Sequence, residues 1–156
     1  MKRILALAPL VLAACGPSSE PSATPDAAPA VVVVTDAWCR ATPNAARAGG
    51  CFATFQSATD DRLTGGSTPR AAQLQVHEMS MDGGMMKMGQ IEGGLPLPAG
   101  ETVSLAPGGN HIMLMELTQP LVEGETVPLT LQFASAPAVT VQAPVRRVTP
   151  GGGEHH

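Results

Sequence analysis

Apolar and polar residues alternate with a period of two in several parts of the chain, most clearly in 127–133 and 139–145. Successive side chains of a strand point to opposite faces, so this pattern predicts strands that are buried on one face. Short β-type runs between Gly and Pro residues predict further strands at 31–38, 51–57, 74–79, 102–105 and 111–117. No long segment has the helical period. About seven short strands predict an all-β domain, either an antiparallel sandwich or a Greek-key barrel.

The N-terminal segment differs from this domain in composition. Lys2 and Arg3 precede an apolar run that ends at Ala14. Such a run is typical of a secretory signal and is too short to cross a bilayer as a helix. Its end, Leu-Ala-Ala followed by Cys15, resembles a bacterial lipobox, which implies cleavage before Cys15 and lipid on its thiol. The alternatives are a plain signal peptide cut elsewhere, or a cysteine there by chance.

These features predict four parts, and an exported periplasmic protein that is lipid-anchored to a bacterial membrane. They are a signal peptide at 1–14, the lipidated Cys15 with a Pro-, Ser- and Ala-rich tether at 15–30, a domain at 31–149 and a flexible tail at 150–156. The formal charge is −4, and the chain has no basic run. This argues against nucleic acid as a partner and leaves the lipid as the only expected membrane contact.

Two cysteines remain after Cys15. Cys39 and Cys51 flank a turn-rich stretch at 42–50, as a bridge between neighbouring strands would require. Disulfides persist in exported proteins, so we expect this pair to be bridged. Two buried free thiols, or a metal-binding pair, are the alternatives.

Methionine and histidine are concentrated in two of the predicted strands. Strand alternation places His77 with Met79, and His111 with Met113, on shared faces at a spacing of about 7 Å. A Gly-Gly turn would bring Met88 back toward His77, and we expect the site at one end of the sandwich. Thioethers are poor ligands for zinc and good ligands for Cu(I), so a Cu(I) site is indicated. Methionines that fill an irregular core are the alternative.

The spacing of these residues resembles that of a known family. Ten residues separate His77 from Met88, and twenty-two separate Met88 from His111, which begins a His-x-Met triplet. This resembles the PCuAC (DUF461-type) family of periplasmic copper chaperones, in which the second spacing is about twenty-one. We assign the extra residue to the Gly- and Pro-rich segment 93–100, where insertions are tolerated. Other matching stretches are Asp36-Ala37-Trp38 with Arg40, Asp60-Asp61-Arg62-Leu63, Pro107-Gly108-Gly109 and Met113-Leu114-Met115.

The resemblance implies a cupredoxin-like barrel that holds Cu(I) near solvent and is not an enzyme. It also implies copper delivery to the CuA centre in subunit II of cytochrome c oxidase, alongside Sco-type copper proteins. The implied ligands are His77, Met88, His111 and Met113, with Met79 as a possible substitute. The other methionines have weaker claims: we expect Met115 in the core, whereas Met85 and Met86 could guide copper in or out.

Other functions fit the sequence less well. A blue-copper protein needs a Cys thiolate beside two His, and no Cys lies in the ligand segments. A structural or adhesive lipoprotein without metal leaves the Met and His spacing unexplained. No nucleophile–base grouping indicates an enzyme, and the Asp60-Asp61 pair is interpreted as a surface turn. His155 and His156, in the tail, offer a second, weak site for Cu(II), or are an incidental polar end.

Overall fold

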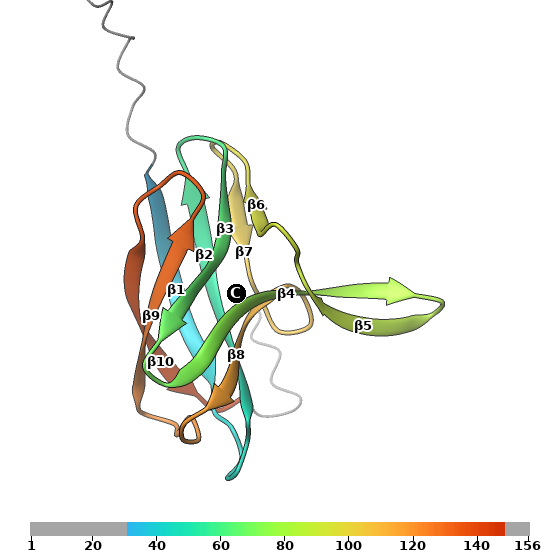
Figure 1. The fold of residues 1–156 in the computed structure, drawn as a ribbon, viewed down its shortest axis with the longest axis vertical. Coiled ribbons are helices and arrows are strands. Elements are labelled where there is room, and N and C mark those ends of the chain that lie inside the picture. Colours follow the sequence, from blue (N-terminus) through green and yellow to red (C-terminus); the bar gives the residue numbers. More distant parts are fainter. Residues whose placement is uncertain (1–30, 149–156) are drawn as a thin grey trace, which may run out of the picture.

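A computed structural model describes residues 31–148, and this part of the chain consists of strands and loops without a helix (Figure 1). The predicted all-β class is confirmed, although residues 31–148 form ten strands and not about seven. The strands are β1 (Val32–Arg40), β2 (Ala48–Ser57), β3 (Asp61–Thr68), β4 (Ala71–Asp82), β5 (Met85–Gln90), β6 (Leu95–Leu97), β7 (Thr102–Ser104), β8 (His111–Leu117), β9 (Thr126–Phe133) and β10 (Val139–Arg146).

Seven of the strands close into a barrel. Their order is β4-β8-β2-β1-β10-β9-β3, and β3 pairs with β4 to complete the ring. The pairs are antiparallel except β1 with β10, which is parallel. The remaining strands lie outside the ring: β5 pairs with β4, β6 with β3 and β7 with β2.

The barrel interior is mostly aliphatic, as the scarcity of aromatic residues in the sequence requires, and Phe55 is a fully buried aromatic exception. Leu63, Ile112, Leu114 and Leu129 are fully buried. Cys39 and Cys51 form a disulfide that joins register partners of β1 and β2 inside this core. The predicted pairing is therefore present, and it stabilises the fold by about 2–4 kcal/mol.

Strand β8 turns one set of side chains into the core and the other set outward. Ile112 and Leu114 face inward, so Met115 shares the outer face of the sheet and is only half-buried. The prediction that Met115 belongs to the core is therefore wrong. Glu116 has a φ of 55°, which interrupts the alternation and returns Leu117 to the interior.

The hairpin formed by β4 and β5 projects from the side of the barrel (Figure 1). Strand β8 begins opposite His77, so β4 beyond that residue pairs with β5 alone. Gly83 and Gly84, with φ of 60° and 82°, form the two-residue turn, a conformation that glycine adopts readily. All six residues of β5 are exposed. The predicted position of the site at an end of the sandwich is wrong, because the strands that carry it meet on the barrel side.

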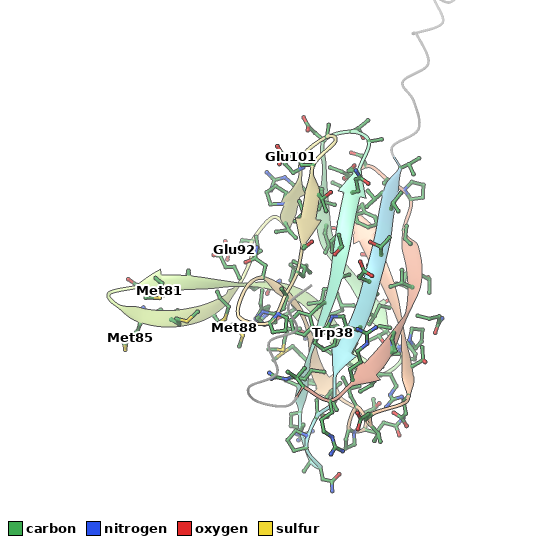
Figure 2. All side chains as sticks on the ribbon, turned by 180° about the vertical axis from the view of Figure 1, so that it is seen from behind. Trp38, Met81, Met85, Met88, Glu92 and Glu101 are labelled. Carbon is green, nitrogen blue, oxygen red and sulfur yellow. A yellow bond between two sulfur atoms is a disulfide. The ribbon has the colours of Figure 1, made fainter. Side chains whose placement is uncertain are left out.

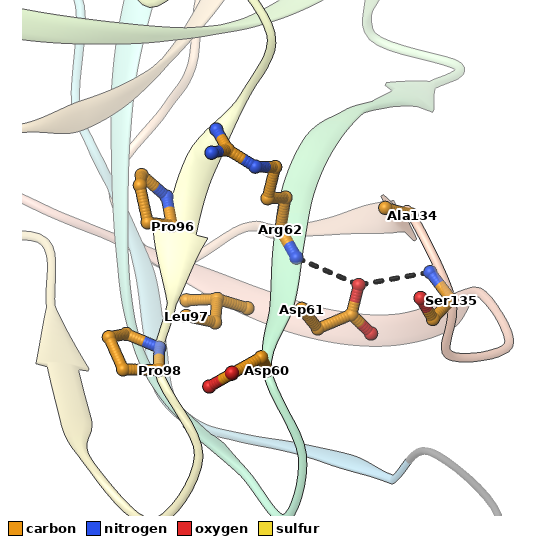
Figure 3. A pocket seen from close by; sticks show the side chains of 8 residues that line it. All are labelled: Asp60, Asp61, Arg62, Pro96, Leu97, Pro98, Ala134 and Ser135. Atoms are coloured by element: carbon orange, nitrogen blue, oxygen red, sulfur yellow. Dashed lines mark hydrogen bonds between the residues drawn. The ribbon is translucent and has the colours of Figure 1, made fainter.

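A pocket of about 400 Å³ lies at the start of β3 (Figure 3). Asp61 is only 7% exposed there, and its carboxylate accepts hydrogen bonds from the backbone N–H groups of Arg62, Ser135 and Ala136. Asp60 is exposed and accepts one from the backbone N–H of Ala99. The surface-turn interpretation is therefore wrong for Asp61, which holds the loop after β9.

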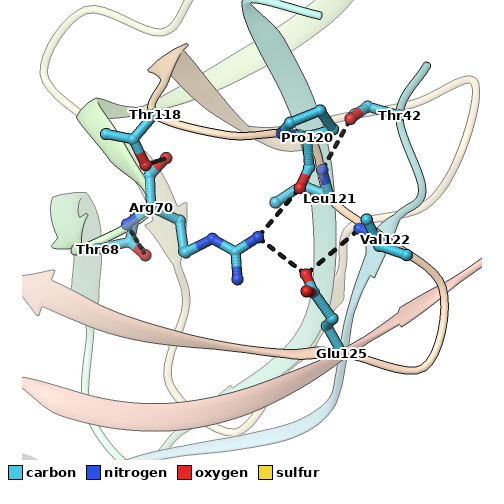
Figure 4. Close-up of polar contacts among 8 residues, drawn as sticks. All are labelled: Thr42, Thr68, Arg70, Thr118, Pro120, Leu121, Val122 and Glu125. Atoms are coloured by element: carbon cyan, nitrogen blue, oxygen red, sulfur yellow. Dashed lines mark hydrogen bonds and ion pairs between the residues drawn. The ribbon is translucent and has the colours of Figure 1, made fainter. Parts of the chain in front are cut away.

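Arg70, in the turn between β3 and β4, contacts the segment that connects β8 to β9 (Figure 4). Its guanidinium donates to the carbonyl of Pro120, and it forms an ion pair of 2.9 Å with Glu125. The backbone carbonyl of Arg70 also accepts a hydrogen bond from the backbone N–H of Thr118. These contacts fix the turn between β3 and β4, from which β4 begins.

The described residues do not include the predicted signal peptide at 1–14, the tether at 15–30 with Cys15, or His155 and His156. Residues 31–148 contain no helix long and apolar enough to cross a membrane.

Candidate metal site

Three neighbouring strands bring the predicted ligands to one outer face of the barrel. On β4 and β8, His77 is the direct cross-strand partner of His111, and Met113 follows two residues later on the same face. On β4 and β5, Met79 is the direct partner of Met88. Met88 is thus diagonal to His77 instead of opposite to it. All five candidate residues share this face because side chains alternate along a strand.

The ring of His77 is held with one nitrogen free. Its Nε2 lies 2.9 Å from Oε1 of Gln75, an oxygen that only accepts, so Nε2–H donates and Nδ1 carries the lone pair. This Nδ1 is buried and has no hydrogen-bond partner in residues 31–148. A buried, unused lone pair on an imidazole is what a metal ligand requires.

His111 is oriented in a similar way from the loop that precedes β8. It is 8% exposed, and its Nδ1–H donates to the carbonyl of Gly109 at 3.0 Å, which leaves the lone pair on Nε2. Its ring centroid is 6.4 Å from that of Phe52 and 5.9 Å from that of His77. Phe52 in turn packs on Trp38, with centroids 4.6 Å apart. The aromatic residues therefore support one side of the site.

The surroundings of His77 favour its neutral form. Burial lowers the pKa of His77, and the neighbouring His111 lowers it further. Only a neutral imidazole donates to a metal. At neutral pH, protons therefore compete weakly for this ligand.

A cavity of about 210 Å³ opens beside the ring of His111, and His77 is not among the residues that line it. Met79, His111 and Met113 line it, together with Arg40, Gly50, Phe52, Pro107 and Gly108. Met88 does not line it and is 51% exposed (Figure 2). Met79 thus lies at the cavity, whereas Met88 is its exposed cross-strand partner, and both remain candidate thioether ligands.

The donors of this face are soft. Within residues 31–148, no group of three or more His, Cys, Asp or Glu residues is arranged to hold a metal. Cys39 and Cys51 are bridged in the core, so neither provides the thiolate of a blue-copper site. Two imidazoles with thioethers suit Cu(I) better than zinc or a hard cation.

The groups that orient the two rings were not among the residues predicted from the sequence. Gln75 lies two residues before His77, and strand alternation would have placed both on one face. Gly109 contributes a loop carbonyl, for which the sequence carries no signal. Phe52 is on the outer face of β2 and is nevertheless buried, because Trp38 and His111 cover it.

Comparison with known proteins identifies the family. Residues 32–145 match the family model described as "Putative lipoprotein LpqE-like". The chain belongs to this LpqE-like family. A protein of Leifsonia xyli subsp. xyli, named "Putative lipoprotein Lxx21020", is 39% identical over 84 residues, which are 54% of this chain and 51% of that protein. The chain spans about half the length of this curated relative.

Solved structures have the same fold as this LpqE-like chain. The copper-bound PCuAC domain from PmoF2 has a TM-score of 0.63 at 23% identity, over 75% of this chain and 93% of that domain. The solution structure of CuI-DR1885 from Deinococcus radiodurans has a TM-score of 0.58 at 31% identity, over 81% of each chain. The resemblance to PCuAC proteins and the cupredoxin-like fold predicted from the sequence are therefore confirmed.

Proposed function

We propose that this LpqE-like protein is an exported, lipid-anchored copper chaperone that binds one Cu(I) ion at the face of β4, β5 and β8. The observation that carries the proposal is the buried, unpartnered Nδ1 of His77, in a ring whose centroid is 5.9 Å from that of His111. Structures of similar proteins described as copper-bound and CuI-bound support it. The lipoprotein name of the family supports the anchor.

The proposed ligands are His77, His111 and Met113, with Met88 or Met79 completing the set. The thioethers are neutral, and because the pKa of His77 is lowered, its ring does not have to lose a proton at neutral pH. The ion enters and leaves as Cu(I), so the protein performs ligand exchange and not catalysis. Met88 is exposed, so the ligands of an acceptor can approach the ion from its side and replace those of the chaperone.

We further propose that the acceptor is the CuA centre in subunit II of cytochrome c oxidase, with a Sco-type copper protein in the same process. The PCuAC resemblance and the lipobox-like end of the leader support this assignment. A membrane-anchored carrier remains within reach of a membrane-bound oxidase. The C-terminal His155 and His156 remain a proposed weak site for Cu(II).

Metal choice is tested by an anaerobic competition titration against a Cu(I) chelator, with Zn(II) titrated in parallel. We expect one tight Cu(I) equivalent, and a copper-edge X-ray absorption spectrum with both nitrogen and sulfur neighbours. Zinc binding that equals or exceeds Cu(I) binding would refute the proposed site. Transfer to the apo form of a CuA-containing subunit II fragment, followed by the CuA absorption bands, tests the acceptor.

The fourth ligand is identified by paired variants with similar volume. Met88→Leu and Met79→Leu are compared for Cu(I) affinity, with Met85→Leu as the control, because Met85 is an exposed methionine on the other face of the hairpin. Loss of affinity in Met88→Leu supports the ligand set implied by the family pattern. Loss in Met79→Leu alone shows that Met79 takes that place.

A further inference from the structure

The face of the hairpin that carries Met79 and Met88 has two more methionines beyond the proposed site. Met81 and Met86 are direct cross-strand partners, and each lies two residues farther from the barrel along its strand than Met79 or Met88. Met81 is 68% exposed and Met86 is 58% exposed. Figure 2 shows Met81 on the part of the hairpin distant from the barrel and Met88 closer to its base.

The hairpin geometry brings the sulfurs of each pair within reach of one another. Asp82 and Met85 flank a two-residue turn, so their pair exchanges hydrogen bonds and the next pair does not. Met81 with Met86, and Met79 with Met88, therefore occupy the non-hydrogen-bonded positions, where Cα atoms are only about 4.5 Å apart and side chains are closest. The two pairs are separated along each strand by about 7 Å.

Packing does not explain these methionines. Beyond His77 the hairpin has no barrel strand beside it, and all of β5 is exposed, so Met81 and Met86 cover no core. Large apolar side chains gathered on an exposed ribbon are typical of binding surfaces. The charged residues of this segment lie on the opposite face, where Lys87 pairs with Asp82.

We propose that Met81 and Met86 form an outer Cu(I) site that loads the inner site and is weaker than it. This inference rests on the proposed copper function. The ion moves inward by ligand exchange: Met79 and Met88 bind it as Met81 and Met86 release it, and His77, His111 and Met113 then retain it. Copper remains Cu(I) throughout, and no proton or electron is transferred, because thioethers bind metals without deprotonation.

The test is an anaerobic Cu(I) titration of the purified chain, with ¹³C-labelled methionine methyl groups followed by NMR. The first equivalent should shift the Met113 methyl signal, and further Cu(I) should shift those of Met81 and Met86. The Met81→Leu/Met86→Leu variant should lose the second binding event and take up copper from a chelator complex more slowly. Met85→Leu, altered on the other face of the same hairpin, is the matched control and should behave as the parent chain.

Each result has a distinct meaning. A parent chain that binds one equivalent tightly, with Met81 and Met86 signals unmoved by excess Cu(I), overturns the outer site and leaves the chaperone proposal intact. A chain with no tight equivalent refutes the proposed function itself. Equal slowing of copper uptake in Met85→Leu and in the double variant also overturns the outer site, because it makes the effect general to the hairpin.

Discussion

The pocket at Asp61 and the face shared by His77 and His111 each border a cavity, and they differ in whether the polar atoms of Asp61 and His77 have hydrogen-bond partners. The Asp61 pocket is the larger, at about 400 Å³ against about 210 Å³. Burial alone would raise the pKa of Asp61, but hydrogen bonds from backbone N–H groups lower it below its ordinary value. Its carboxylate is thus already used by the fold. His77 instead keeps a buried lone pair without a partner.

The proposed metal site is therefore chosen by an unused acceptor and not by the size of a cavity. Nε of Arg70 is also buried without a partner. An arginine N–H can only donate, however, and carries no lone pair for a metal. Of the two buried side-chain atoms without a partner in residues 31–148, only the one on His77 can act as a ligand.

The largest expected effect on the fold comes from Asp61→Ala. The substitution leaves three backbone N–H groups without their acceptor, and we expect the free energy of unfolding to fall by about 3–4 kcal/mol. Chemical denaturation measures this loss. Asp60→Ala is the control and should cost about 1 kcal/mol or less, because Asp60 is exposed and accepts one hydrogen bond. An equal loss in both variants would contradict a special role for Asp61.

His111→Ala and His77→Ala should mainly weaken Cu(I) binding, whereas Asp61→Ala mainly weakens the fold. Each removes a proposed ligand, and we expect Cu(I) affinity to fall about a hundredfold or more, beyond the range for residues that only orient a ligand. Chelator competition measures the affinity, and the melting temperature shows whether the fold persists. If both variants bind Cu(I) as the parent does, the assignment of this face as the metal site is wrong.

Gln75→Leu tests the orientation of His77 without removing a ligand. The amide fixes the imidazole tautomer through the 2.9 Å hydrogen bond, and its loss should weaken Cu(I) binding about tenfold. Gln142→Leu is the control, since Gln142 is an exposed residue of β10, pairs with Pro128 of β9 and lies on neither strand that carries the two rings. Comparable weakening in the two variants would mean that the effect is not specific to His77.

Met115→Ala measures how far the core extends on β8. Met115 is half-buried on the outer face, so we expect a loss of about 1 kcal/mol, less than the cost of removing a fully buried side chain. Leu114→Ala, next to it and fully buried, should cost about 2–5 kcal/mol. A loss from Met115→Ala as large as that from Leu114→Ala would restore Met115 to the core.

The smallest expected effect is a dependence of stability on pH. Because folding lowers the pKa of His77 below the ordinary 6.5, the unfolded chain binds more protons in that range. The contribution of neutral His77 to the free energy of unfolding is therefore fully present above pH 6.5. It is lost as the pH falls from there through the pKa that His77 has in the folded chain. Thermal unfolding of the metal-free chain between pH 7 and pH 5 measures the slope, and His77→Gln should flatten it. Stability that rises toward pH 5 would contradict this sign.

The sequence predicted the barrel more completely than the site. Alternating segments such as 127–133 were assigned correctly because one face is buried. Strand β3 was missed because Gly65 and Gly66 look like turn residues. At Gly66, however, a Cβ would lie 2.2 Å from the carbonyl oxygen of Thr130, so close packing and not a turn requires the glycine. Strand β5 was missed because neither of its faces is buried, so no hydrophobic period marks it.

For the site, alternation correctly placed His77 with Met79 and His111 with Met113. It did not predict which residues face each other across strands, because register depends on turns and on neighbouring strands. Met88 was expected to come back toward His77, and it lies opposite Met79 and diagonal to His77. The free Nδ1 depends on a hydrogen bond to Gln75, which only the folded strand reveals.

The two-residue turn of the hairpin also determines which changes of length the family can tolerate. Inserting or deleting one residue between His77 and Met88 would force a bulge or a new turn, or move Met88 to the opposite face. The segment from Ile91 to Asn110 instead leaves the hairpin and passes through two short outer strands before β8 begins. One residue can be added there without changing the partners of His111. Relatives that build the same site should therefore keep the first spacing fixed and vary the second.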